Sequence, residues 1–265
     1  MTGSSASKTT PGTVLFIQHD WEATPGYVGA RMAERGFETT TVTIAATHAN
    51  SNPQMEFGDP GEFDVIVPLG SIYSVYDTDR IGNWIGAELD FLARAYAQDI
   101  PILGICFGGQ ALAAALGGTV EQSPEPEVGW LTVDSDRPDD LAEGPWMQWH
   151  YDRFTVPTAG TELARNSVGP QAFTMGRSLG VQFHPEVTVD IVNSWLTGAP
   201  AEELDKPHID IGKIRADTEW LAPQAKARTD RLVDWFLDDI AGFDHPNPDP
   251  SSANLSSAAK SESPS

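Results

Sequence analysis

A lone cysteine is the first candidate for chemistry in this sequence. Cys106 is the only cysteine among 265 residues, and it lies in the segment Gly104–Gln110. An apolar run at 101–105 precedes it, and a stretch of small residues at 111–116 follows. This pattern predicts a strand, a sharp turn and a helix, the arrangement that exposes a serine in nucleophile elbows. A helix beginning just after the sulfur also favours the thiolate. A lone cysteine is often a small buried hydrophobe, but the flanking glycines favour a nucleophile.

His184 is the candidate base for that nucleophile. A catalytic cysteine needs a base to take its proton and a third group to orient the base. His184 follows the apolar run 181–183, and Glu186 lies two residues further on, close enough to reach the far ring nitrogen. A single histidine is more often a satisfied core side chain, but its combination with Glu186 and Cys106 indicates catalysis.

A tetrahedral intermediate also needs backbone N–H donors for its oxyanion. The residue after the nucleophile, Phe107, is expected to supply one of them. The second is expected from the Gly70–Ser71 turn, which follows the neighbouring predicted strand.

Alternating strands and helices are predicted to position these residues. Apolar or β-branched runs at 14–17, 39–44 and 63–69 predict strands, and 25–35 and 80–98 predict helices. This order predicts an α/β fold with a doubly wound, mostly parallel sheet, whose ligands bind beyond the carboxyl ends of the strands.

The second half of the chain has a different pattern. Short β-rich runs separated by turns predict a small antiparallel β portion beside the parallel sheet. These runs are 119–121, 129–134, 146–156, 171–175 and 179–183. Helices are expected at 187–196 and within 217–240, the latter starting at Pro223 because proline favours the first turn of a helix.

Composition predicts one domain over residues 12–243, with a disordered N-terminus at 1–11 and a disordered tail at 244–265. No run approaches the ~18–20 apolar residues of a membrane span, and no secretion signal is evident, so we expect a cytoplasmic protein without membrane contact. A single cysteine, which cannot form an internal disulfide, suits that compartment. The net charge of −22, without a basic cluster, argues against nucleic-acid binding.

The motifs resemble those of the class I (triad) glutamine amidotransferases, which have a flavodoxin-like core. Gly104–Gln110 and the His-Pro-Glu sequence at 184–186 carry the resemblance. Further segments are similar to the stand-alone branch that resembles the glutaminase domain of GMP synthase: 69–77, 127–130, 148–154 and 182–188.

This resemblance implies a reaction without metal or cofactor. Cys106 attacks the γ-carbonyl of glutamine or a γ-glutamyl compound and forms a thioester, His184 transfers protons, and Glu186 orients His184. Gln110 matches a position that helps to hold the substrate, the alternative being a polar helix-start residue in contact with solvent. The family usually has Gly-Gly-Pro where this chain has Gly70, Ser71 and isoleucine. Serine resists positive φ, so Ser71 either weakens the oxyanion turn, rearranges it or offers its hydroxyl.

Three functions are compatible with this sequence. The first is a glutamine amidotransferase that passes ammonia to a separate synthetase partner, since no Gly-x-x-x-x-Gly-Lys-Ser/Thr phosphate loop is present. The second is a stand-alone γ-glutamyl hydrolase or peptidase, and the third is a catalytically silent binding protein.

Other polar residues receive weaker expectations. His150 and Asp152 match a segment that borders the site in relatives, and catalytic and structural roles there are equally compatible with the sequence. His19 follows the first predicted strand, where an ordinary loop role is expected. The remaining histidines need no special role, and the aspartates at 134–140 are expected to form a solvated turn rather than a cation loop, because the EF-hand glycine and glutamate are missing.

Overall fold

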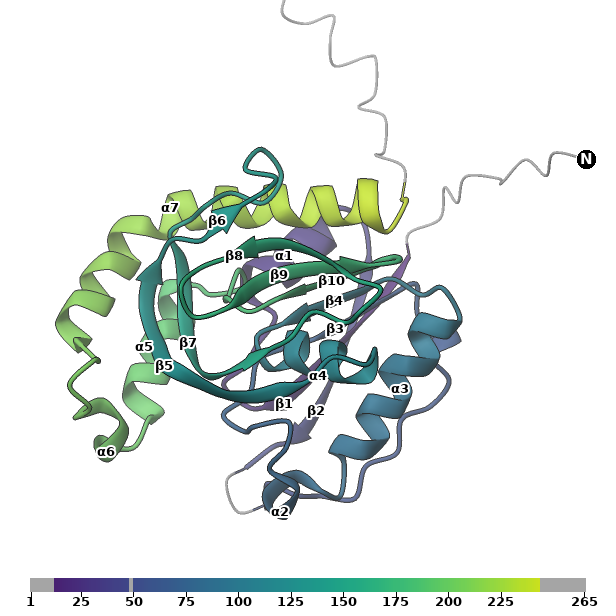
Figure 1. Ribbon diagram of the computed structural model, residues 1–265, viewed down its shortest axis with the longest axis horizontal. Coiled ribbons are helices and arrows are strands. Elements are labelled where there is room, and N and C mark those ends of the chain that lie inside the picture. The colour runs from purple at the N-terminus through teal and green to yellow at the C-terminus, as the bar shows by residue number, and fades with distance from the viewer. Residues whose placement is uncertain (1–11, 48–49, 244–265) are drawn as a thin grey trace, which may run out of the picture.

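The computed structural model describes residues 12–47 and 50–243, so the predicted disordered tails lie outside the described residues. An eight-stranded sheet forms its centre, in the order β2-β1-β3-β4-β10-β9-β8-β6, and β5 and β7 form a separate antiparallel pair (Figure 1). The first five of these strands pair in parallel and the remainder antiparallel. The predicted fold class is therefore confirmed. The strands are β1 (Thr13–Asp20), β2 (Glu38–Ala45), β3 (Val65–Pro68), β4 (Ile102–Ile105), β5 (Val120–Leu131), β6 (Asp134–Ser135), β7 (Trp146–Phe154), β8 (Thr161–Arg165), β9 (Pro170–Met175) and β10 (Ser178–Val181).

Helices cover both faces of the sheet. The side chains of β1, which point alternately to the two faces, contact helices on each side. Val14 and Phe16 pack into one core cluster with residues of α1 (Gly26–Glu34) and α7 (Ile211–Trp235). Leu15 and Ile17 pack into the other, with residues of α3 (Ile85–Ala97) and α4 (Phe107–Ala115). Successive strand side chains point to opposite faces, so a continuously apolar strand is buried on both. Each large apolar side chain buried in this way contributes about 1.5–3 kcal/mol.

Strand β10 corrects one prediction. The run 179–183 was expected in the antiparallel portion, but β10 pairs in parallel with β4, with Val181 opposite Ile105. It also pairs antiparallel with β9 and so joins the two parts of the sheet. Short apolar runs carry no information on strand direction. The consequence is functional, because the carboxyl ends of β4 and β10 lie side by side.

The helices depart from prediction at two places. The run 80–98 forms two helices, α2 (Thr78–Ile81) and α3, because the chain leaves helical geometry at Trp84. Helix α7 begins at Ile211, where the Asp210 carboxylate accepts a hydrogen bond from the Lys213 amide at 2.9 Å, and Pro223 lies in its interior. Proline deletes one helical hydrogen bond, but the helix buries apolar side chains on either side of it and continues.

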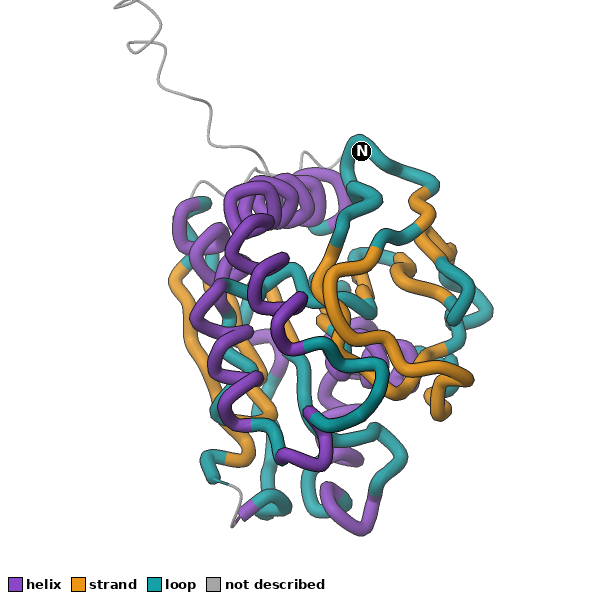
Figure 2. Tube along the Cα trace, turned by 90° about the vertical axis from the view of Figure 1, so that its left-hand side faces the viewer, coloured by secondary structure: helices purple, strands orange, loops and turns teal. Residues whose placement is uncertain are grey.

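The remaining helices lie near one end of the sheet. Figure 2 views the molecule from the side of α5 (Val189–Gly198), α6 (Ala201–Leu204) and the first turns of α7, where helices gather in front of the strands. A 3-10 turn, η2 (Pro60–Glu62), precedes β3, and a π-helical segment, η3 (Phe236–Ile240), follows α7. No helix within 12–47 and 50–243 is long and apolar enough to cross a membrane.

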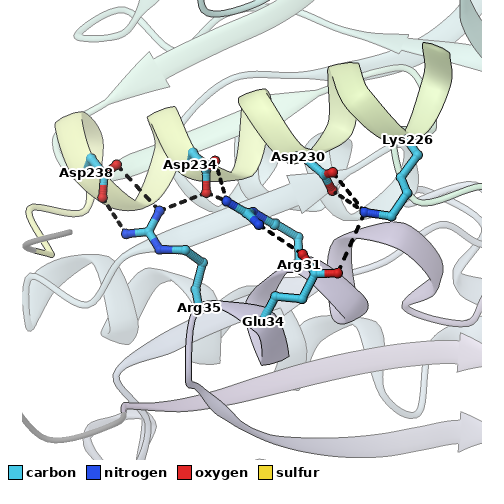
Figure 3. A network of polar contacts seen from close by, with 7 residues as sticks. All are labelled: Arg31, Glu34, Arg35, Lys226, Asp230, Asp234 and Asp238. Carbon is cyan, nitrogen blue, oxygen red and sulfur yellow. Dashed lines mark hydrogen bonds and ion pairs between the residues drawn. The ribbon is translucent and has the colours of Figure 1, made fainter. Parts of the chain in front are cut away.

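A ladder of charges fastens α7 and η3 to α1 and to Arg35, the residue that follows α1 (Figure 3). Arg31 contacts Asp234 at 2.7 Å, and Arg35 contacts Asp234 at 2.8 Å and Asp238 at 2.5 Å. The Arg35 side chain is only 4% exposed, so its charge is largely desolvated and depends on these carboxylates. Shared arginine–carboxylate contacts of this kind are stronger than isolated surface pairs.

Candidate active site

Cys106 lies at the turn between β4 and α4, and its backbone is strained. Its φ of 52° and ψ of −110° make it one of two non-glycine residues with positive φ in the described chain. The flanking glycines are required sterically. A Cβ on Gly104 would lie 2.6 Å from the Gly108 carbonyl oxygen, and a Cβ on Gly108 would lie 2.0 Å from the Pro68 carbonyl oxygen. The predicted strand, sharp turn and helix are all present.

His184 and Glu186 follow β10, whose carboxyl end adjoins Cys106. The amide of Cys106 donates to the Val181 carbonyl at 2.9 Å. His184 Nδ1 lies 2.7 Å from Glu186 Oε1, and both side chains are buried. The backbone fixes this turn, since the His184 amide donates to the Met147 carbonyl at 2.9 Å.

Burial and neighbouring charges shift the pKa of His184 in opposite directions. Burial disfavours the imidazolium, but the nearby Cys106 sulfur and Glu186 carboxylate favour it through their charge, and Glu186 also through its hydrogen bond to Nδ1, so the pKa of His184 is raised well above its usual 6.5. The other ring nitrogen, Nε2, has no hydrogen-bond partner among the described residues. The raised pKa favours the protonated form of His184, which can give its proton to a leaving group. The geometry therefore suits acid–base chemistry at the sulfur.

The Gly70–Ser71 turn follows β3 and borders the same site. A Cβ on Gly70 would lie 2.9 Å from His184 Cε1 and 3.9 Å from Cys106 Cβ. Ser71 does not have positive φ, so the strain that serine would suffer there does not arise. Its hydroxyl accepts a hydrogen bond from the Tyr73 amide at 3.3 Å. The backbone amides of Ser71 and Phe107 have no acceptor among the described residues.

Two buried glutamines connect the nucleophile to β7. Gln110 is buried rather than in contact with solvent, and its Nε2 donates to the Asp152 carbonyl and to Gln182 Oε1, both at 3.3 Å. Gln182 Nε2 in turn lies 3.8 Å from Cys106 Sγ as a donor. Sequence reasoning missed Gln182. The available signal was a polar residue inside an apolar run, since buried amides are nearly always hydrogen-bonded.

A pocket of about 470 Å³ opens over Cys106 and His184. It is also lined by Gln110 and by the predicted oxyanion residues Gly70, Ser71 and Phe107. Its outer wall combines aromatic and charged residues from β7, α5 and the region of α6: Trp149, His150, Tyr151, Asp152, Trp195, Glu203 and Lys206. Trp195 packs against the His184 ring at 4.9 Å between centroids. His150 and Asp152 thus lie at the pocket, and the structure alone assigns neither a catalytic role.

His19 corrects another expectation. It is the penultimate residue of β1, completely buried, and does not lie in a loop. Its Nδ1 lies 3.1 Å from the Gly70 carbonyl oxygen, and its Nε2 lies 2.9 Å from Glu88 Oε1. Its neighbour Asp20 faces the pocket, and burial raises the pKa of the Asp20 carboxyl despite hydrogen bonds from the Glu22 and Ala23 amides. Among the residues described, no cluster of three or more histidine, cysteine or acidic side chains could hold a metal ion.

Comparison with known proteins gives concordant matches. The sequence profile of the family "Glutamine amidotransferase class-I" matches residues 28–193. The glutamine-hydrolyzing GMP synthase of Thermus thermophilus is 40% identical over 109 residues, covering 36% of this chain and 20% of that protein. One subunit of the glutamine-hydrolyzing GMP synthase of Sulfurisphaera tokodaii is 33% identical over 137 residues, covering 48% of this chain and 69% of that subunit. The matched segment thus spans about a fifth of the length of the full GMP synthases.

Solved structures share the fold over most of the chain. A glutamine amidotransferase from Methylobacillus flagellatus superposes with a TM-score of 0.74 at 21% identity, covering 89% of this chain and 96% of that one. A glutamine amidotransferase from Thermotoga maritima gives 0.72 at 24% identity, covering 86% and 98%.

Proposed function

We propose, from the premise that this chain belongs to the glutamine amidotransferase class-I family, that it hydrolyses the γ-amide of glutamine to glutamate and ammonia. Cys106 is the nucleophile, His184 the general acid and base, and Glu186 the group that orients His184. The observation that carries this proposal is the strained Cys106 backbone at a pocket that His184 also lines, with Glu186 in contact with His184. Backbone strain persists mainly where function requires it.

In the first half of the reaction, the Cys106 thiolate attacks the γ-carbonyl carbon, and the carbonyl electron pair moves onto oxygen. The amides of Ser71 and Phe107 would bind that oxyanion, and the lack of an acceptor for either among the described residues supports this role. The intermediate collapses, the carbon–nitrogen bond breaks, and the His184 imidazolium gives its proton to the departing nitrogen. Ammonia leaves, and a γ-glutamyl thioester remains on Cys106.

In the second half, water enters the position that ammonia has left. Neutral His184 takes a proton from this water as its oxygen attacks the thioester carbonyl. The second intermediate expels the Cys106 thiolate, which restores the ion pair with His184, and glutamate departs. Glu186, 2.7 Å from Nδ1, holds the imidazole in one orientation and stabilises its charged form throughout.

The acceptor of the ammonia is proposed to be bound by a separate synthetase protein. The similarity to single subunits of archaeal GMP synthases supports this assignment. Ile72 lines the pocket, and Tyr76 donates a hydrogen bond to Asp152, another lining residue. The two residues are 53% and 50% exposed, which suits contact with a partner.

A second candidate is a stand-alone γ-glutamyl hydrolase or peptidase, and the size of the pocket favours it. Pockets of roughly 300–1,000 Å³ hold drug-sized ligands, and glutamine is much smaller. A cavity of about 470 Å³ lined by Trp149, Tyr151 and Lys206 leaves room for a group attached to the γ-nitrogen. The same triad chemistry would then release an amine in place of ammonia.

Labelling and substrate profiling test these assignments together. A diazo-ketone analogue of glutamine should form one adduct, on Cys106, detected by mass spectrometry of the digested protein, and His184→Ala should slow its formation sharply. An unlabelled Cys106, under conditions that label a related enzyme, would instead support the silent binding protein. Turnover of glutamine only with a synthetase favours the amidotransferase, whereas cleavage of γ-glutamyl peptides by the isolated chain favours the hydrolase.

A further inference from the structure

A buried ion pair behind the active site touches the oxyanion turn and has no role in the steps above. His19 and Glu88 are both 0% exposed, and they join the end of β1 to α3. Burying a charged pair is costly, and a well-packed apolar pair would often be at least as stable. The contacts of His19 indicate what the pair does.

His19 has acceptors at both ring nitrogens. Nδ1 faces the Gly70 carbonyl at 3.1 Å, and Nε2 faces the Glu88 carboxylate at 2.9 Å. A neutral imidazole carries one N–H, whereas the imidazolium carries two and can donate to both. Burial opposes the charge on His19, but Glu88, Gly70 and the neighbouring Asp20 favour it, and its pKa is raised above 6.5. The charged groups that face His19 are therefore Glu88 from α3 and Asp20 from β1.

Peptide geometry carries this contact into the pocket. The Gly70 carbonyl and the Ser71 N–H belong to one planar trans peptide, so they point in opposite directions. The carbonyl points at His19, which is not among the pocket-lining residues, and Ser71 lines the pocket with Cys106. A donor on the carbonyl therefore fixes the N–H toward the pocket. It also polarises the peptide and makes the N–H a stronger donor, because linked hydrogen bonds reinforce one another.

The same imidazole supports the second oxyanion donor. The rings of His19 and Phe107 pack edge to face, with centroids 4.6 Å apart, and Trp84 stacks on His19 at 5.7 Å. Phe107 supplies the N–H that follows the nucleophile. His19 thus contacts the residues of both proposed donors, Gly70 of the Gly70–Ser71 peptide and Phe107.

We infer that His19, held by Glu88, is a positioning residue that orients and polarises the Gly70–Ser71 peptide as an oxyanion donor. This inference rests on the proposed hydrolytic function. It also explains how this chain uses serine in the turn: the peptide is fixed by a side chain behind it, and Ser71 avoids positive φ.

Two substitutions of His19 separate positioning from a merely structural role. Asparagine places its amide nitrogen where Nδ1 lies and keeps the donor to Gly70, while glutamine places its amide nitrogen where Nε2 lies and keeps the donor to Glu88. Loss of one oxyanion donor lowers kcat by about 10²–10³-fold, and a donor that is present but misoriented should cause a smaller loss. We expect His19→Gln to lose about 10- to 100-fold in kcat and His19→Asn to lose several-fold less, with similar KM values.

The assay measures kcat and KM for glutamine and a γ-glutamyl anilide, thermal unfolding, and alkylation of Cys106 by iodoacetamide. Alkylation proceeds without an oxyanion, so its rate should match the wild type in both variants. A structural role for the ion pair predicts the opposite order, because His19→Gln keeps the contact with Glu88. Equal or reversed kcat values, or a parallel loss of alkylation, would overturn the positioning role alone. A wild-type protein that neither hydrolyses nor is labelled would overturn the proposed function with it.

Glu88→Gln provides a test that does not depend on the folding of either His19 variant. Glutamine can hydrogen-bond to Nε2 and leave the Nδ1 contact in place, but it removes the charge that favours the imidazolium. The alkaline decline of kcat should then begin at lower pH than in the wild type. Superposable pH profiles would contradict the polarising role of His19. Asp234→Asn, which weakens the α1–α7 ladder, serves as the destabilised control with a wild-type profile.

Discussion

A single methyl group added at Gly70 should slow hydrolysis about tenfold and destabilise the fold without preventing folding. Gly70 does not have positive φ, so alanine is tolerated by the backbone and the effect is steric. The new Cβ would lie 2.9 Å from His184 Cε1, and the two must separate by about 0.5 Å to reach an ordinary contact of 3.4 Å. A displacement of 1 Å at a reacting group costs about 10²-fold, so half of that costs about tenfold in kcat. Overpacking of this kind destabilises by about 1–3 kcal/mol.

Gly86→Ala is the matched control for that substitution. Gly86 lies in α3, and a Cβ there meets nothing within 4 Å. Alanine stabilises a helix relative to glycine by about 0.5–1 kcal/mol, so this variant should unfold at a slightly higher temperature than the wild type and keep the wild-type kcat. Steady-state hydrolysis and thermal unfolding are measured on both variants. Wild-type kcat in Gly70→Ala, or an equal loss in Gly86→Ala, would refute the steric reasoning.

Three further predictions test other parts of the molecule. Glu186→Gln removes a charge that raises the pKa of His184, so that pKa should fall and kcat should drop by about 10²–10⁴-fold; a pH profile within a few-fold of wild type would contradict the orienting role. Cys106→Ser should abolish hydrolysis and leave the unfolding temperature nearly unchanged, because the residue is buried and isosteric, and retained turnover would exclude the sulfur as nucleophile. Asp234→Asn should lower the free energy of unfolding by roughly 1–3 kcal/mol. Partial burial of Asp234 opposes its ionisation, but Arg31 and Arg35 hold the pKa of its carboxyl below its usual 3.8. The stability difference between Asp234→Asn and the wild type should therefore be present above pH 4 and shrink as the pH falls further. Urea denaturation at several pH values measures this difference, and a difference that does not depend on pH would be inconsistent with the ion pairs.

The sequence was most informative where structure is local. The strand, turn and helix around Cys106 follow from an apolar run, two glycines and small residues within about a dozen positions, and the structure confirms that order. The parallel half of the sheet follows from continuous apolar strands separated by helices. The catalytic roles of Cys106, His184 and Glu186 stay predictions, although the structure brings all three to one site.

The contacts that sequence reasoning missed join distant segments. His19 meets Glu88 across 69 positions, and Gln182 meets Cys106 across 76. Neither pair has a local signature, because each depends on which strands become neighbours. The direction of β10 belongs to the same class, since its register with β4 is settled by packing and not by its own residues. Pro223 is a case in which a local signal was misleading. Proline predicts a helix start, but Pro223 lies inside α7, which is stabilised by the burial of its apolar side chains.

Trapping the covalent intermediate tests the central claim most directly. The wild-type protein, mixed with glutamine or a cleavable γ-glutamyl compound, is quenched in acid during turnover and analysed by mass spectrometry after digestion. A thiol-dependent mechanism predicts one γ-glutamyl group on the peptide that carries Cys106, released by hydroxylamine and missing from Cys106→Ser. Steady hydrolysis by the wild type without any acylated Cys106, or undiminished hydrolysis by Cys106→Ser, would contradict the account.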